Sequence, residues 1–458
     1  MAIETPGNPA CAPNNRSSRG AWLAFGLGVA AILASLPWTW FGTDNPIRDE
    51  ITHMPLVRQW LERPESISIA RFPEPKGAAF FAAGKAWGGI FGTSCPALRS
   101  MVVLSAVGAL AAWAWLTGLW GLPRRFAAGI ALLAVPYFFL CTQMFLTEMP
   151  ALLLAFLGLA MAQKIRGGGG IGWAIGVALS LGAMLWVRQI FVVVPLALLV
   201  LSPWAGRHRL KLAIAVGASL LPLAAMYMLW GAMVPPGAIQ RFHGTGGFYP
   251  STFLFCLAVL GALGWPMLLA ALPRRRERLF ILAGAALAMG IYLALPSDFY
   301  AEMSASSKRM GLVQTTLLSL PGPAWAPRLV LLVAICAGGA VFGRLAYLLV
   351  GTGQDAWVRQ ACAIALMGTA IWLFAAPVFF DRYLLLPLVM IFAIVSQRAV
   401  RPLAMGCIVL FLLIAAGHAA YVTRHPKQPF RPLPIKDMFH EGSYDAAARP
   451  PPEAHRWT

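Results

Sequence analysis

Long apolar segments recur throughout the sequence, and they constrain the fold more than any other feature. Of the 458 residues, 59% are hydrophobic and only 12% are charged, whereas about a quarter of the residues of a soluble domain are charged. The apolar runs are about 17–23 residues long, which suits helices that cross a hydrocarbon core of about 30 Å. They do not alternate between apolar and polar residues as barrel strands do. The sequence therefore predicts an all-α polytopic membrane protein.

The apolar segments predict about 13 transmembrane helices, with boundaries defined to within a few residues. The first segment is longer than a signal-peptide core and is predicted to be a retained anchor. Arg188 and Gln189 interrupt an apolar stretch from Ile171 to Trp204, so this region forms either two spans or one re-entrant hairpin. The predicted spans lie near residues 21–41, 98–120, 126–144, 149–163, 171–187, 190–204, 210–232, 251–271, 279–295, 326–348, 360–378, 383–396 and 402–422.

Lys and Arg residues cluster in alternate short loops and predict the orientation of the chain, because such loops are usually cytoplasmic. We therefore expect a disordered cytoplasmic N-terminus (1–20), a transmembrane domain (21–422) and an outer C-terminal tail (423–458). The first outer segment is then 42–97. The net charge of +19 reflects this topology and contact with phospholipid, and it is poorly explained by nucleic-acid binding because the basic residues form no separate domain. The basic loops lie near residues 122–125, 164–170, 205–211, 273–278 and 398–401.

The first outer segment begins with a cluster of titratable residues, Asp49, Glu50 and His53. Residues four apart share one face of a helix, whereas neighbours diverge by about 100°. Asp49 is therefore expected to face the same way as His53. We predict Asp49 as a general base, with Glu50 positioning an acceptor and His53 nearby. The alternative is an ordinary solvated helix at the membrane interface.

Two amphipathic helices are predicted in this outer segment. One continues from the acidic cluster to Arg63, and the other corresponds to the apolar run 78–91, which Lys85 interrupts. A Pro-rich turn at 72–77 joins them. Such helices lie in the plane of the membrane surface and would form a platform there.

Further candidates lie beside the predicted spans on the same outer side. Glu148 precedes Pro150 at the start of a helix, where it is either a second carboxylate facing a substrate or a capping residue. Arg188 lies within apolar sequence, and a charge at that depth is costly unless it is paired or hydrated. It is either a ligand for a lipid phosphate or a snorkelling arginine.

Other outer candidates lie in hairpins and loops. Arg382 and Tyr383 end a late hairpin, where Asp381 and Arg382 could also form a self-contained pair. His243, Lys308 and Arg309 lie in loops that could order over a ligand or remain solvated. The predicted spans carry no carboxylate near their middle, where a proton-coupled transporter would be expected to place one.

In these residues the chain resembles the GT-C glycosyltransferases, integral membrane enzymes that use polyprenyl-phosphate sugars on the non-cytoplasmic side. It is most similar to the enzyme that adds the terminal α-1,2-glucose to a dolichol-linked oligosaccharide. The Pro-rich turn at 72–77 departs from that family's signature. The matching features are the DE-x-x-H motif at Asp49–His53, Glu148 after the third span, the pair Arg188-Gln189, a long outer loop, and Arg382-Tyr383 followed by Pro387.

The resemblance implies a GT-C-like fold and an inverting transfer of a hexose or pentose from a polyprenyl-phosphate donor to a lipid-linked glycan, glycolipid or polysaccharide. It implies that Asp49, Glu50 and Glu148 serve catalysis, while Arg188, Gln189, Arg382 and Tyr383 bind the donor phosphate. A phosphate ester is already a usable leaving group, so no metal or other cofactor is expected. The Ala- and Arg-rich composition favours a bacterial inner membrane with a periplasmic site. A lipid or polysaccharide flippase and a non-catalytic assembly partner are the alternatives.

Overall fold

The computed structural model describes residues 15–38, 40–42, 46, 49–201, 208–236, 247–270, 273–295, 309–310, 312–318, 323, 325–376, 379–399, 406–407, 409–414 and 417. Within these ranges the protein is built from helices, and six are long and apolar enough to cross a membrane. The prediction of an all-α polytopic membrane protein is confirmed. The six are Cys95–Leu119, Glu148–Arg166, Arg209–Trp230, Arg275–Ala294, Trp325–Val350 and Ala356–Leu373.

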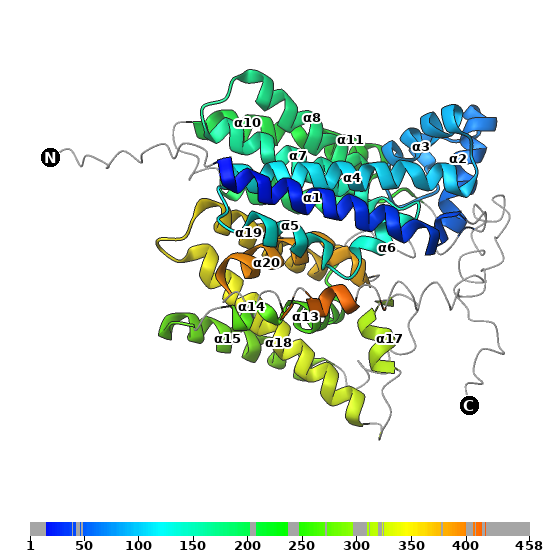
Figure 1. Cartoon of the computed structure of the whole chain (residues 1–458). Coiled ribbons are helices and arrows are strands. Elements are labelled where there is room, and N and C mark those ends of the chain that lie inside the picture. The colour runs from blue at the N-terminus through cyan, green and yellow to red at the C-terminus, as the bar shows by residue number, and fades with distance from the viewer. Residues whose placement is uncertain are drawn as a thin grey trace.

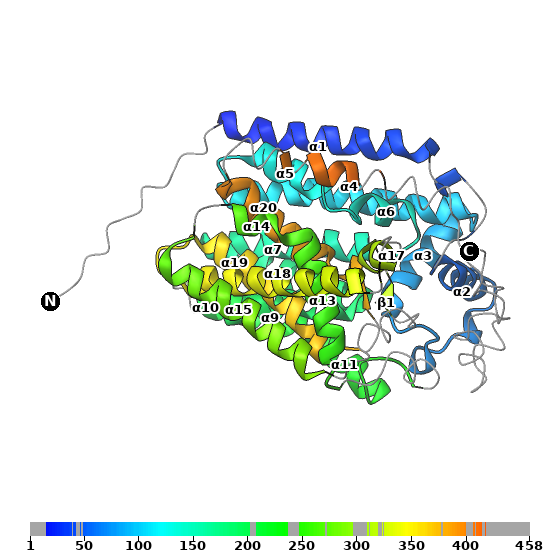
Figure 2. The same cartoon turned by 90° about the horizontal axis from the view of Figure 1, so that it is seen from below.

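Helices from the first half of the chain pack against one another. The helix α1 lies along α4 and α5, α4 packs on α7, and α8 lies between α7 and α10 (Figures 1 and 2). Short 3-10 helices η1 (Leu36–Trp38) and η2 (Trp40–Gly42) follow α1. The bounds are α1 (Asn15–Ser35), α4 (Cys95–Leu119), α5 (Arg125–Leu133), α6 (Phe138–Gln143), α7 (Glu148–Arg166), α8 (Ile171–Val187), η5 (Gln189–Val192), α9 (Val193–Val200), α10 (Arg209–Ser219) and α11 (Leu221–Trp230).

In the second half, α18 packs between α13 and α15 at close backbone distance. A Cβ atom at Gly338 would lie 1.8 Å from the carbonyl oxygen of Leu257, and one at Gly284 would lie 2.1 Å from that of Gly339. Small residues allow such close packing of helices in membranes. The bounds are α13 (Pro250–Gly264), α14 (Pro266–Leu269), α15 (Arg275–Ala294), α18 (Trp325–Val350), α19 (Ala356–Ala370), η7 (Ile371–Leu373) and α20 (Leu385–Arg398).

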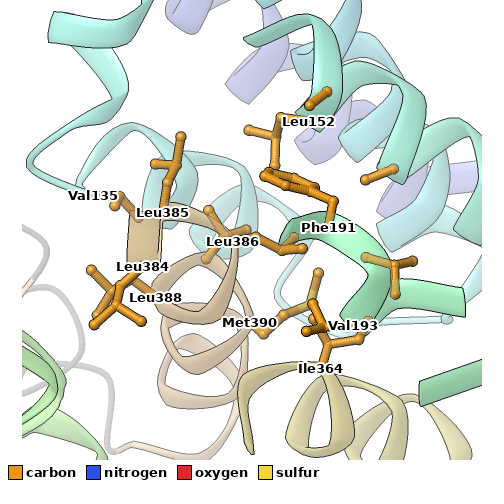
Figure 3. Close-up of a cluster of buried hydrophobic side chains, with 14 of the residues drawn as sticks. Val135, Leu152, Phe191, Val193, Ile364, Leu384, Leu385, Leu386, Leu388 and Met390 are labelled. Carbon is orange, nitrogen blue, oxygen red and sulfur yellow. The ribbon is translucent and has the colours of Figure 1, made fainter. Parts of the chain in front are cut away.

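The two halves meet where α20 packs on α5 and α19, and where α19 packs on α9. Leucine and other apolar side chains fill this junction, among them Leu386, Met390, Ile364 and Phe191 (Figure 3). The 3-10 helix η8 (Asp381–Leu384) leads directly into α20. The packed junction therefore fixes the position of η8 and of the charged side chains that it carries.

The two helices predicted in the segment 42–97 are present as α2 (Glu50–Glu62) and α3 (Ala78–Phe91). Two short 3-10 helices, η3 (Pro64–Ser66) and η4 (Ile69–Arg71), lie between them. Both views place α2 and α3 at one end of the long helices, on the same side as α17 (Leu312–Leu318) (Figures 1 and 2). Nearby, strand β1 (Arg309–Met310) pairs in parallel with β2 (Phe379–Phe380).

Several predicted spans differ from the structure. The span 126–144 is divided into α5 and α6, because Pro136 lies between them and proline cannot continue a helical hydrogen-bond ladder. A helix begins at Asn15, inside the segment predicted to be disordered, and residues 1–14 lie outside the described ranges. Most of 402–422 is also outside them. A total of 13 transmembrane helices is therefore not established.

The region 171–204 contains two helical pieces separated by a break at Arg188. Helix α8 ends at Val187, Arg188 is extended with φ −155° and ψ 104°, and η5 and α9 follow. Helix α8 packs on α7, α10 and α11, whereas α9 packs on α10 and α19. The break places Arg188 at the C-terminal end of α8, beside the start of α7.

Candidate active site

Five charged side chains from distant parts of the chain meet where α2, α3, α7, α8 and η8 come together. Asp49 precedes α2, Lys76 ends the Pro-rich turn before α3, and Glu148 begins α7. Arg188 lies in the break after α8, and Arg382 lies in η8. None of the five lies in the middle of a long helix, so the site lies at one end of the helices.

Asp49 is held by two cations. Its Oδ2 accepts a hydrogen bond of 2.5 Å from Arg382 Nη2 and one of 3.0 Å from Lys76 Nζ. Burial alone would raise the pKa of Asp49, but Arg382 and Lys76 together hold that pKa well below its usual range. Asp49 is therefore an ionised carboxylate that orients two cations.

His53 lies one helical turn after Asp49, on the face that the spacing of four residues predicts, and it contacts the same lysine. Its Nδ1 is 3.0 Å from the carbonyl oxygen of Phe145, which can only accept, so Nδ1 carries the proton. Its Nε2 therefore accepts a hydrogen bond of 2.7 Å from Lys76 Nζ. Burial, together with the Lys76 ammonium, lowers the pKa of His53 to about 3. His53 is thus a neutral acceptor that orients Lys76.

Glu148 joins the two arginines. Its Oε1 lies 2.9 Å from Arg382 Nε and 3.3 Å from Arg188 Nη2, and all three side chains are buried. Arg188 also donates to the hydroxyl of Thr147, the residue before Glu148. The Nε–H of Arg188 finds no hydrogen-bond acceptor in the described part of the chain. Arg188 therefore keeps a donor that a ligand could use.

Tyr383 supports these arginines through its ring. The guanidinium of Arg188 lies over the ring at 4.5 Å from the centroid, and Trp372 stacks at 5.1 Å with an interplanar angle of 12°. A cation over an aromatic face is attracted by the quadrupole of the ring. Gln189, predicted to bind the donor with Arg188, is buried, and its Nε2 lies 3.9 Å from the sulfur of Met226.

Glu50 faces different partners from its neighbour Asp49. Its carboxylate forms a two-point ion pair with Arg99 of α4, at 2.9 Å from Nε and 2.7 Å from Nη2. It also accepts a hydrogen bond of 2.6 Å from the backbone N–H of Phe145, and it is fully buried. These contacts fasten α2 to α4 and to the turn before α7. Its predicted role in positioning an acceptor remains a prediction.

Asp381 and Arg382 do not share partners either. Asp381 Oδ2 accepts hydrogen bonds of 2.7 Å from the hydroxyl of Tyr137 and 2.9 Å from the N–H of Val313 in α17. The hydroxyl of Tyr137 in turn accepts from the N–H of Leu312. Asp381 thus anchors α17 beside η8, and burial raises its pKa to about 6 despite these bonds.

Sequence reasoning missed two residues of this site, Lys76 and Glu74. Glu74 is buried, and its Oε2 lies 3.8 Å from His53 Nε2. Both lie in the Pro-rich turn at 72–77, where the sequence departs from the family signature. That departure was the available signal.

Other predicted site residues lie outside the described part of the chain. His243 and Lys308 fall in undescribed loops, and only the backbone of Arg309 is described, in β1. Among the residues that the structure describes, no group of three or more His, Cys, Asp or Glu side chains could hold a metal ion. Independence from a metal nevertheless remains a prediction.

Comparisons with known proteins add a distant structural likeness. No family model and no curated protein matches the sequence. Among solved structures, the fold is similar to that of ArnT from Cupriavidus metallidurans, in the apo state and bound to undecaprenyl phosphate. The identities are 14% and 15%, and each match covers 89% of this chain and 78% of the other with a TM-score of 0.41. A likeness at this level does not establish an activity, so the functional argument rests on the site.

Proposed function

We propose that this protein is an integral membrane glycosyltransferase of the GT-C type that transfers a sugar from a polyprenyl-phosphate donor to an acceptor on the non-cytoplasmic side. The observation that carries the proposal is the convergence of Arg188 and Arg382 on one oxygen of Glu148. Arg382 also contacts Asp49, whereas Arg188 keeps an Nε–H without a hydrogen-bond acceptor among the described residues. A phosphate group offers the additional oxygens, and guanidinium groups bind phosphate well.

The depth of these arginines suits a phosphate that is attached to a lipid. Arg188 interrupts apolar sequence at the end of α8, and Arg382 precedes the apolar helix α20. A polyprenyl chain would then lie among the helices while its phosphate reached the arginines. Lys76 approaches from the outer segment and is positioned by Asp49 and His53 to contact the same phosphate.

The proposed reaction is a substitution at the anomeric carbon of the sugar. A carboxylate takes the proton of an acceptor hydroxyl, the acceptor oxygen bonds to the anomeric carbon, and the bond from that carbon to the phosphate oxygen breaks. The polyprenyl phosphate leaves with the electron pair. Arg188 and Arg382 stabilise the negative charge that develops on it, and such electrostatic stabilisation is the main source of rate enhancement in many enzymes. Inversion follows if the acceptor attacks opposite the leaving group.

The experiment that tests this function is transfer of labelled sugar by purified protein. A panel of polyprenyl-phosphate hexoses and pentoses is incubated with lipid-linked and polysaccharide acceptors. We expect labelled acceptor with at least one donor, and loss of that product with Arg382→Ala. If no donor supports transfer and reconstituted protein instead moves polyprenyl-linked glycans across vesicle membranes, the flippase alternative is correct.

A further inference from the structure

Three carboxylates share the site, but their partners differ. Asp49 and Glu148 each contact an arginine, Asp49 through Arg382 and Glu148 through both arginines. A carboxylate paired with a guanidinium is stabilised in its ionised form and is a poor acceptor for a proton. Glu74 instead lies beside the neutral ring of His53, with its Oε2 3.8 Å from His53 Nε2.

We propose that Glu74 is the general base that takes the proton of the acceptor hydroxyl, a role that the sequence assigns to Asp49. The proposal rests on the proposed function, because it names the base for that reaction. Asp49 then has the role of positioning Lys76 and Arg382, both of which bond to its Oδ2.

Glu74 is placed to accept this proton. It lies in the same turn as Lys76, two residues away, and both side chains approach His53 Nε2, Glu74 Oε2 at 3.8 Å and Lys76 Nζ at 2.7 Å. An acceptor hydroxyl beside Glu74 would therefore approach a sugar whose phosphate is bound by Lys76. In the step, the O–H bond of the acceptor breaks, its proton passes to Glu74, and its oxygen attacks the anomeric carbon. The lipid phosphate leaves with the electrons, and Glu74 afterwards releases the proton to water.

The charged and titratable groups around Glu74 favour this role. Burial raises the pKa of Glu74, and the Lys76 ammonium only partly opposes that effect, while the Asp49 carboxylate adds to it. His53 does not compete for the proton, since its pKa is lowered to about 3. When the pKa values of two carboxylates are displaced in opposite directions, the one with the raised pKa is the stronger base.

The test compares matched variants in the transfer assay. Glu74→Gln should lower kcat by about 10²–10⁴-fold, the usual contribution of a general base, with polyprenyl phosphate affinity within about threefold of wild type. Glu74→Asp should restore part of the rate and shift the acid limb of the pH profile of kcat. Glu65→Gln, the same change at an exposed position of the same segment, should have no effect. Thermal unfolding of each variant shows that it is folded.

The possible outcomes distinguish an error in the assignment of Glu74 as the base from an error in the proposed glycosyltransferase function. Transfer by Glu74→Gln at the wild-type rate, with an unchanged acid limb, overturns the assignment of Glu74 while the glycosyltransferase proposal stands. If Asp49→Asn instead lowers kcat by about 10²–10⁴-fold at unchanged donor affinity, Asp49 is the general base. Absence of transfer by wild-type protein with every donor overturns the proposed function, and the base assignment with it.

Discussion

The buried pair Glu50–Arg99 makes a prediction that does not depend on any substrate. Glu50 receives two hydrogen bonds from Arg99 and one from the backbone of Phe145. Replacing one partner of a buried ion pair leaves the other charge uncompensated and costs about 3–5 kcal/mol. Arg99→Met and Glu50→Gln should therefore each lower the free energy of unfolding by about that amount.

The double variant should be far less damaging than the sum of the single changes. It removes both buried charges, while the introduced amide still offers an oxygen to the N–H of Phe145. Replacing both charges of a buried pair is often nearly neutral, so the coupling between Glu50 and Arg99 should be about 3 kcal/mol or more.

The assay is reversible unfolding in mixed micelles, titrated with a denaturing detergent, for wild type, both single variants and the double variant. Glycosyl transfer by the double variant is measured in parallel and should persist, because these contacts hold α2 in place rather than reaching the cations of the site. Additive effects within about 0.5 kcal/mol would refute the coupling. A stable but inactive double variant would show that Glu50 acts in catalysis.

Two further predictions follow from the same end of the molecule. Gly77→Ala should lower both stability and transfer rate, because a Cβ atom there would lie 1.6 Å from the carbonyl oxygen of Trp186. Gly89→Ala, whose Cβ atom would meet its nearest atom at 3.8 Å, should leave both unchanged. Equal effects in the two variants would contradict the close contact at Gly77. The raised pKa of Asp381, about 6, means that its protonation stabilises the fold below about pH 4 and that this contribution is lost as the pH rises through 6. Asp381→Asn should therefore remove on the order of 2 kcal/mol of pH-dependent stability between pH 4 and pH 7, as measured by unfolding at both pH values, and an unchanged pH dependence would contradict the assignment.

The sequence predicted the parts of this structure that depend on local spacing. The lengths of the apolar segments predicted membrane helices. The apolar run 78–91, which contains Lys85, predicted a helix, and α3 has those bounds. The spacing of four residues placed Asp49 and His53 on the same face, where both contact one lysine. The pattern of Glu148 and Pro150 predicted the start of a helix at that point.

The remainder depended on contacts between residues far apart in the chain. Nothing in the sequence near Glu50 indicates that its partner is Arg99, 49 residues later. The sequence therefore predicted related roles for Asp49 and Glu50, although their side chains have different partners. Lys76 reaches Asp49 only because the Pro-rich turn folds back over α2. Pro136 was a readable signal for the division of the span 126–144, since proline interrupts a helix.

The central claim is that Arg188 and Arg382 bind the phosphate of a lipid-linked donor, and equilibrium binding tests it most directly. Affinities of purified protein are measured for a polyprenyl phosphate and for the corresponding polyprenol, which lacks only the phosphate. The wild type should bind the phosphate at least tenfold more tightly, and Arg188→Ala or Arg382→Ala should each weaken that binding by about 10–100-fold, since a hydrogen bond to a charged group contributes about 1.5–3 kcal/mol. Lys85→Ala, which changes a half-buried cation in α3, should bind as wild type does. Equal affinity for the two lipids, or arginine variants that bind the phosphate like wild type, would contradict the claim.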